Sequence, residues 1–257
     1  MKNIIQQDLH DGVLTITLNR PEKKNAMNWD MWANLRDTMY YAKEDDSVVC
    51  TVLTGAGGNF CSGADLSGMD KKSDGEETHP FESCARAISD FDKPLIGAAT
   101  GVAVGGGATM LYHADIVYVG ESLRMRLPFP QLGLVPELAS SYKLQANIGA
   151  QRAAELFYTA EWINAQRAIE TGIAVRCYKD DDLLENALEK ACQIAQWPVN
   201  SLRESKRCLQ AMHAEGIERA YQIEAEAMSR QVGSPENIEA ITAFKEKRAA
   251  NFRKLKK

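Results

Sequence analysis

The sequence predicts an α/β protein with a helical C-terminal region, and three observations lead to this prediction. Short apolar and β-branched runs alternate with helical patterns in the first half of the chain. Helical patterns dominate after Val175, and the character of the sequence changes near Trp197 and Pro198. We therefore expect a β/α core over residues 1–196, followed by a helical region over residues 197–257.

The individual elements follow from local patterns. Runs of β-branched and apolar residues predict strands at Val13–Leu18, Val48–Leu53, Leu95–Ala99 and Ile116–Val119. Apolar residues at helical spacing predict a helix from Trp29, with Asn28 as its N-cap. The polar stretch Asp70–Pro80 predicts a surface loop. The same helical spacing predicts later helices at Asp182–Gln196, Leu202–Ala214, Ile217–Gln231 and Pro235–Lys254.

Two glycine-rich stretches, Gly55–Asp65 and Gly101–Gly107, each follow a predicted strand. A glycine-rich turn before a helix leaves main-chain N–H groups unshielded. Two such turns facing each other would hold a carbonyl oxygen that gains negative charge. The dinucleotide-binding pattern G-x-G-x-x-G is absent, because Phe60 and Met110 replace its last glycine. The P-loop and the G-x-S-x-G elbow are absent too. Tight turns that serve packing alone are the alternative.

Composition excludes several classes of protein. The chain has 257 residues, 45% of them apolar and 25% charged, and its net charge of −5 disfavours nucleic-acid binding. The first residues lack an apolar signal region and no long uncharged apolar run occurs, so we expect a cytoplasmic protein that binds no membrane. The six cysteines form no C-x-x-C pair, which predicts reduced thiols and neither disulfides nor a zinc site.

Five motifs, in the family's order, resemble the crotonase (enoyl-CoA hydratase/isomerase) superfamily. They are Val13–Pro21 with Lys24–Met27, Phe60–Leu66, Lys93–Gly107, Leu132–Pro136 and Phe244–Arg248. The resemblance implies a spiral of ββα units whose C-terminal helices associate into a homotrimer or hexamer, and an acyl-CoA thioester as substrate. It places the oxyanion-hole N–H groups on Ala64 and Gly106. Stabilising an enolate needs only these two donors, so no metal is implied and no cofactor besides the CoA of the substrate.

The resemblance also implies contacts with the substrate. The candidate substrate-binding residues are Lys24, Ala26, Ser62, Asp65, Leu66, Phe129, Leu134, Phe244 and Lys247. Among them, Phe244 and Lys247 are expected to close over the adenine end of CoA, often from a neighbouring subunit, although a solvated basic tail is the alternative. Phe129 and Leu134 are expected to line the acyl pocket or the core, and Asp65 is also expected to fix its turn.

Two glutamates typical of the family's hydratases are missing. Their positions hold Thr109 and Phe129 in this chain. Adding water across a double bond needs one group to activate water and one to protonate carbon. The ordinary hydratase mechanism therefore lacks its residues here.

A different carboxylate stands nearby. The pattern L-G-x-x-P-E-x-x-S-S-Y over Leu132–Tyr142 resembles the peroxisomal-type 3,2-enoyl-CoA isomerases, in which this glutamate, here Glu137, is the single base. The resemblance implies an isomerase that forms a thioester enolate, with a raised pKa for Glu137 in an apolar pocket. A helix-start glutamate is the structural alternative. A hydratase-like enzyme that uses Glu137 and a non-catalytic acyl-CoA-binding paralogue also stay open, and His113 is expected to be a packed or turn histidine.

Overall fold

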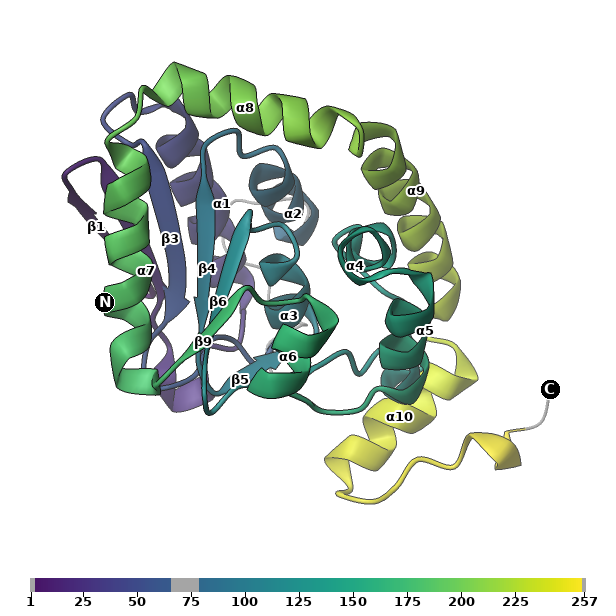
Figure 1. The fold of residues 1–257 in the computed structure, drawn as a ribbon. Coiled ribbons are helices and arrows are strands. Elements are labelled where there is room, and N and C mark those ends of the chain that lie inside the picture. Colours follow the sequence, from purple (N-terminus) through teal and green to yellow (C-terminus); the bar gives the residue numbers. More distant parts are fainter. Residues whose placement is uncertain (1–2, 66–78, 256–257) are drawn as a thin grey trace.

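The computed structural model describes residues 3–65 and 79–255, and a sheet lies at the centre of the fold (Figure 1). Within these residues the sheet has six strands, in the spatial order β1 (Ile5–His10), β2 (Val13–Leu18), β3 (Cys50–Gly55), β4 (Leu95–Ala99), β6 (Ile116–Gly120) and β9 (Arg176–Tyr178). Strand β1 is antiparallel to β2, and all other neighbours are parallel. Parallel neighbours require crossover connections, which the intervening helices supply.

A second, smaller sheet contains three strands from the middle of the chain. Its strands are β5 (Val102–Val104), β7 (Arg124–Arg126) and β8 (Ile163–Asn164). The chain passes from β4 in the large sheet to β5 in the small one, through helix α3 (Gly106–Leu111), and then repeats the step from β6 to β7. This alternation is the spiral of ββα units that the resemblance implies.

Helices surround both sheets. The longer ones are α1 (Trp29–Glu44), α2 (Phe81–Ser89), α4 (Ser140–Ile148), α5 (Ala150–Thr159), α6 (Ala165–Thr171), α7 (Asp180–Ala195), α8 (Val199–Ala211), α9 (Ala214–Gln231) and α10 (Pro235–Lys245). Three short 3-10 helices are η1 (Pro21–Lys23), η2 (Pro130–Leu132) and η3 (Phe252–Lys254). Helix α8 crosses one end of the sheet, and α9 descends beside α4 (Figure 1). In the part of the chain that the structure describes, no helix has the length and apolar character of a membrane span.

The core has two parts, one on each face of the large sheet. Helix α7 covers one face, where Leu183 and Ala187 pack with Cys50 and Val52 of β3. The larger part lies on the opposite face and includes Leu53 of the same strand. The side chains of β3 therefore alternate between two apolar layers, as expected for a strand buried on both faces.

Several sequence predictions are confirmed and others are corrected. The side chain of Asn28 caps α1 by accepting the Met31 N–H over 3.0 Å. Strand β3 begins two residues later than predicted. Strands β1, β5, β7, β8 and β9 were not predicted. The last helix ends at Lys245 instead of Lys254, because Lys247 adopts a left-handed φ of 55° that no α-helix accommodates. Most of the predicted loop, and Leu66, lie outside the described residues.

Candidate active site

The two glycine-rich segments lie side by side. The Cys61 N–H donates to the Val102 carbonyl and the Val104 N–H donates to the Cys61 carbonyl, each over 2.9 Å. Gly63 lies at the closest approach: a Cβ added there would lie 2.6 Å from the Val104 carbonyl oxygen, and its φ is +87°. Glycine alone meets both demands. The two turns therefore face each other as predicted.

Ala64 and Gly106 place main-chain N–H groups at this junction. Ala64 follows Gly63 directly, and Gly106 is the first residue of α3. The Gly106 nitrogen lies 3.8 Å from the position that a Cβ on Gly63 would take. Across residues 3–65 and 79–255, no protein acceptor takes the N–H of Ala64 or of Gly106. Two open donors at one point are what stabilising an oxyanion requires.

The Glu137 carboxylate lies beside the second donor. Its Oε1 is 3.1 Å from the position of a Cβ on Gly106, and the Trp32 Cη2 is 3.3 Å from the same position. Trp32 is buried on α1 and packs edge-on against Phe81 at 5.0 Å between ring centroids. The half-buried Glu137 carboxylate therefore lies near both the Trp32 ring and the first residue of α3.

This apolar setting changes the ionisation of Glu137. Burial, and to a lesser degree the negative charge of Glu224 on α9, raise the pKa of Glu137 to about 7. Removing water from a carboxylate disfavours its charged form, and a like charge nearby adds to the effect. A carboxylate with a pKa near neutrality is well suited to take a proton and to give it back.

An unusual turn carries Glu137. The next two residues, Leu138 and Ala139, have left-handed φ angles of 55° and 49°, each costing a non-glycine residue roughly 1–2 kcal/mol. Two buried side chains hold this turn. The Leu138 carbonyl accepts the Nε2–H of His113 over 2.7 Å, and Glu224 accepts the Ala139 N–H over 2.7 Å. Burial lowers the pKa of His113 to about 4, so the ring is a neutral packed histidine, as predicted.

Four predicted substrate-binding residues lie on two neighbouring segments. Lys24 and Ala26 stand on one, and Ser62 and Asp65 on the other. The Ser62 N–H donates to the Lys24 carbonyl over 3.0 Å, and Asp65 pairs with Arg20 over 3.0 Å. Arg20 also donates to the Ala26 carbonyl, so Asp65 fixes the turn as expected. The structure thus brings these four residues together next to the Ala64 N–H.

The positions that hold glutamates in typical hydratases carry no acid/base group. Thr109 is fully buried, and its hydroxyl donates to the Gly106 carbonyl over 3.3 Å. Phe129 is buried against Phe157, with 6.3 Å between ring centroids. Leu134 is half-buried and its N–H donates to the Phe129 carbonyl over 2.8 Å. Of the two expected roles of Phe129, lining the acyl pocket or packing in the core, the structure shows packing in the core.

Phe244 and Lys247 lie at the end of α10, which packs against η2. The Asn237 side chain on α10 donates to the Leu132 carbonyl over 2.8 Å. Phe244 is 65% exposed and Lys247 is exposed. In the described part of the chain, no hydrogen bond, ion pair or ring contact joins either side chain to the segment of Lys24. Their expected role over the adenine of CoA stays a prediction.

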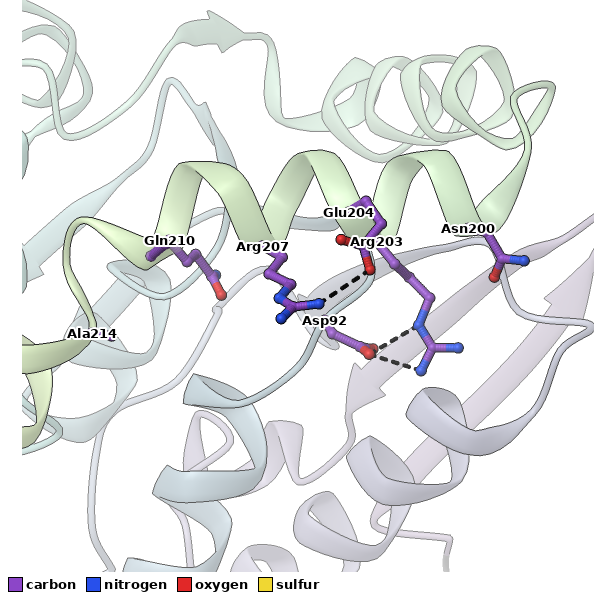
Figure 2. A pocket seen from close by; sticks show the side chains of 8 residues that line it. Asp92, Asn200, Arg203, Glu204, Arg207, Gln210 and Ala214 are labelled. Carbon is purple, nitrogen blue, oxygen red and sulfur yellow. Dashed lines mark hydrogen bonds and ion pairs between the residues drawn. The ribbon is translucent and has the colours of Figure 1, made fainter.

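A cavity of about 640 Å³ lies elsewhere, along α8 (Figure 2). Asp92 and Arg203 form an ion pair of 2.7 Å at its wall, and Arg207 pairs with Glu204 on the same helix. None of the predicted site residues lines this cavity. It is therefore separate from the site at Glu137.

Known proteins match nearly the whole chain. The family described as enoyl-CoA hydratase/isomerase matches residues 8–255. The chain is 30% identical to the 1,2-epoxyphenylacetyl-CoA isomerase of Escherichia coli K12, over 98% of this chain and 99% of that protein. It is also 30% identical to rat enoyl-CoA delta isomerase 2, over 91% of this chain and 61% of that protein. Hydratases are among the other relatives at the same identity.

Solved structures agree with this. The enoyl-CoA hydratase/isomerase from Pseudoalteromonas atlantica T6c superimposes with a TM-score of 0.93 at 35% identity, covering 97% of this chain and 100% of that one. Sequence identity, fold and near-complete coverage all indicate the same family. The chain belongs to the enoyl-CoA hydratase/isomerase family and is an enzyme of the crotonase superfamily.

Proposed function

We propose that this enzyme is a 3,2-enoyl-CoA isomerase in which Glu137 carries the proton between two carbons. The observation that supports this most directly is the position of Glu137 Oε1, 3.1 Å from where a Cβ on Gly106 would stand. The base and an open N–H donor therefore border the same space. Thr109 and Phe129 leave that space without the two carboxylates of an ordinary hydratase.

The reaction needs one base and two donors. The Glu137 carboxylate removes a proton from C2, and the electron pair of that C–H bond moves onto the thioester to form an enolate. The N–H groups of Ala64 and Gly106 bind the enolate oxygen, each contributing roughly 3 kcal/mol to the transition state. The enolate then collapses, the double bond moves from C3 to C2, and protonated Glu137 returns the proton at C4. No metal and no cofactor besides the substrate's CoA takes part.

The same proposal assigns the remaining residues to substrate binding. Lys24, Ala26, Ser62 and Asp65 would hold the CoA part next to the first oxyanion donor, and Leu66 keeps its predicted role in substrate binding. Phe129 and Leu134 would shape the acyl pocket, and the helical region over residues 197–257 would supply Phe244 and Lys247 to the adenine end. In this proposal the enzyme works in the cytoplasm, in fatty-acid metabolism, as a homotrimer or hexamer.

A paired assay on the purified enzyme tests the reaction. We expect 3-hexenoyl-CoA to gain the absorbance of a conjugated thioester, and crotonyl-CoA to keep it. Loss of conjugation in crotonyl-CoA would show hydration instead, with Glu137 activating water. No absorbance change with either substrate would contradict an isomerase that acts on acyl chains of this length. It would favour a non-catalytic acyl-CoA-binding paralogue.

The pH dependence of the rate provides a second prediction. Glu137 must be ionised to accept the C2 proton, and its pKa lies at about 7. We therefore expect kcat/KM to be low below pH 6, to rise through about pH 7 and to level off above it. A profile measured with 3-hexenoyl-CoA in overlapping buffers checks this. An acid limb near pH 4.5, the ordinary range of glutamate, would show that Glu137 is not the base or is not desolvated.

A further inference from the structure

Glu224 connects the C-terminal helices to the turn that carries Glu137. It lies on α9, is 6% exposed, and accepts two main-chain N–H groups. Its Oε2 accepts the Ala139 N–H over 2.7 Å, and its Oε1 accepts the Ser141 N–H over 2.8 Å. Both bonds cross more than 80 residues of sequence. Glu224 therefore binds the two residue positions that flank the start of α4.

Helix α4 has no cap of its own. Its N-cap residue is Ala139, which has no side-chain acceptor and stands at a left-handed φ of 49°. The first N–H groups of a helix need acceptors from outside the helix. Glu224 supplies both oxygens of one carboxylate, a charge-assisted and bidentate arrangement that is stronger than a neutral cap. The left-handed turn at Leu138 and Ala139 thus persists because a distant helix holds it.

We propose that Glu224 is a positioning residue for Glu137: by binding the Ala139 and Ser141 N–H groups it keeps the turn in the conformation that places the Glu137 carboxylate beside Gly106. This inference rests on the proposed role of Glu137. On the other side of the turn, His113 holds the Leu138 carbonyl. Two buried groups from different parts of the fold therefore hold three of the four residues that follow Glu137, namely Leu138, Ala139 and Ser141.

Glu224 also acts on Glu137 through its charge. Its negative charge adds to burial in raising the pKa of Glu137. Burial raises the pKa of Glu224 itself, while the hydrogen bonds from Ser141 and Ala139 oppose that rise. The main-chain donors thus help to keep Glu224 ionised, and an ionised Glu224 disfavours ionisation of Glu137. The Glu224 carboxylate therefore affects both the position of Glu137 and its pKa.

Other charged and titratable groups lie on the elements around this turn. Those on the elements packed against it are Cys61, Arg86, His113, Lys143, His213, Glu218 and Tyr221. Burial raises the pKa of Cys61 to about 12 and lowers that of His113 to about 4, so neither titrates near pH 7. Arg86 on α2 pairs with Glu218, and His213 meets the Tyr142 hydroxyl over 3.0 Å. All of them are identical in the variants below, so they do not produce a difference between variants.

The decisive variant is Glu224→Gln. It keeps the size of the side chain and one acceptor oxygen, but it removes the charge and sets an NH2 group against one main-chain N–H. We expect kcat with 3-hexenoyl-CoA to fall about 100-fold, the usual result of a small misplacement of a reacting group, with KM close to the wild-type value. The acid limb of kcat/KM should move to lower pH, because Glu137 loses a negative neighbour.

Two further variants separate geometry from charge. Glu224→Asp keeps the charge but shortens the reach, so kcat should fall while the acid limb stays in place. It also keeps the inference testable if E224Q does not accumulate as a folded protein by circular dichroism. Glu226→Gln, on the exposed side of α9, is the matched control and should leave both quantities unchanged. A wild-type kcat in E224Q and E224D, or a lower kcat in E224Q with an unmoved acid limb, would overturn the inference.

Glu137→Gln in the same assay distinguishes this inference from the proposed function. If E137Q loses turnover and E224Q behaves as wild type, the positioning role is wrong and the isomerase proposal is unaffected. If E137Q keeps full turnover, the proposed function fails, and the positioning role fails with it.

Discussion

Glu137→Gln is expected to lower turnover of 3-hexenoyl-CoA about 1000-fold, within the range that a general acid/base contributes. The glutamine has nearly the same shape, so its contacts with Gly106 and Trp32 are kept. It has no basic oxygen, however, and cannot accept the C2 proton. Stopped-flow or steady-state absorbance measures the rate, and calorimetric titration with a saturated acyl-CoA measures affinity.

The affinity measurement is what makes this variant informative. We expect the dissociation constant of the acyl-CoA to change little, because the predicted CoA contacts lie on the segments of Lys24, Ser62 and Phe244 and not on that of Glu137. Glu121→Gln, an exposed substitution in the turn after β6, serves as the control. Unchanged turnover in E137Q would remove Glu137 from the mechanism.

Gly63→Ala is expected to lower kcat by roughly 100-fold or more, the effect of losing one oxyanion donor. The new Cβ would lie 2.6 Å from the Val104 carbonyl oxygen and would force apart the segments that carry Ala64 and Gly106. The left-handed φ of +87° adds strain that alanine tolerates poorly. Steady-state kinetics, with thermal unfolding recorded in parallel, measures both consequences.

Gly58→Ala is a matched control for this variant. Gly58 lies in the same glycine-rich stretch at a φ of +70°, but a Cβ there would meet no atom within 4 Å. It reproduces the strain of a left-handed alanine without the collision. We expect G58A to lower the melting temperature while keeping kcat. Equal kcat losses in G58A and G63A would show that backbone strain, not separation of the donors, is responsible.

Much of the fold was predictable because its signals are local. The β-branched runs predict β2, β3, β4 and β6 of the large sheet, and Asn28 caps α1 through atoms three residues apart. Strands β5, β7, β8 and β9 have two or three residues and were not predicted, since runs of that length carry too little pattern. The six-residue β1 was also missed, because only Ile5 in it is buried and its polar residues show no apolar run. The premature end of α10 depends on the left-handed φ of Lys247, and no residue type at that position indicates it.

The candidate site divides in the same way. Its glycine-rich turns and Glu137 stand in recognisable motifs, so their encounter could be anticipated from sequence. Glu224 could not, because a glutamate between Ile223 and Ala225 on a long helix looks like any solvent-facing residue. Only the three-dimensional contact with Ala139, 85 positions away, gives it a role. Trp32 is similar: its apolar spacing predicts burial in α1, but not a place beside Gly106.

The two core layers also place residues that stabilise the fold and residues assigned to the reaction on different faces of the large sheet. Gly106 and Glu137 lie beside Trp32 of the larger layer, while α7 covers the opposite face of the sheet with Leu183 and Ala187. Substitutions beneath α7 are therefore expected to change the thermal stability of the protein without moving the two N–H donors or Glu137. The sheet separates these two faces, so stability and activity can be altered by substitutions at different positions.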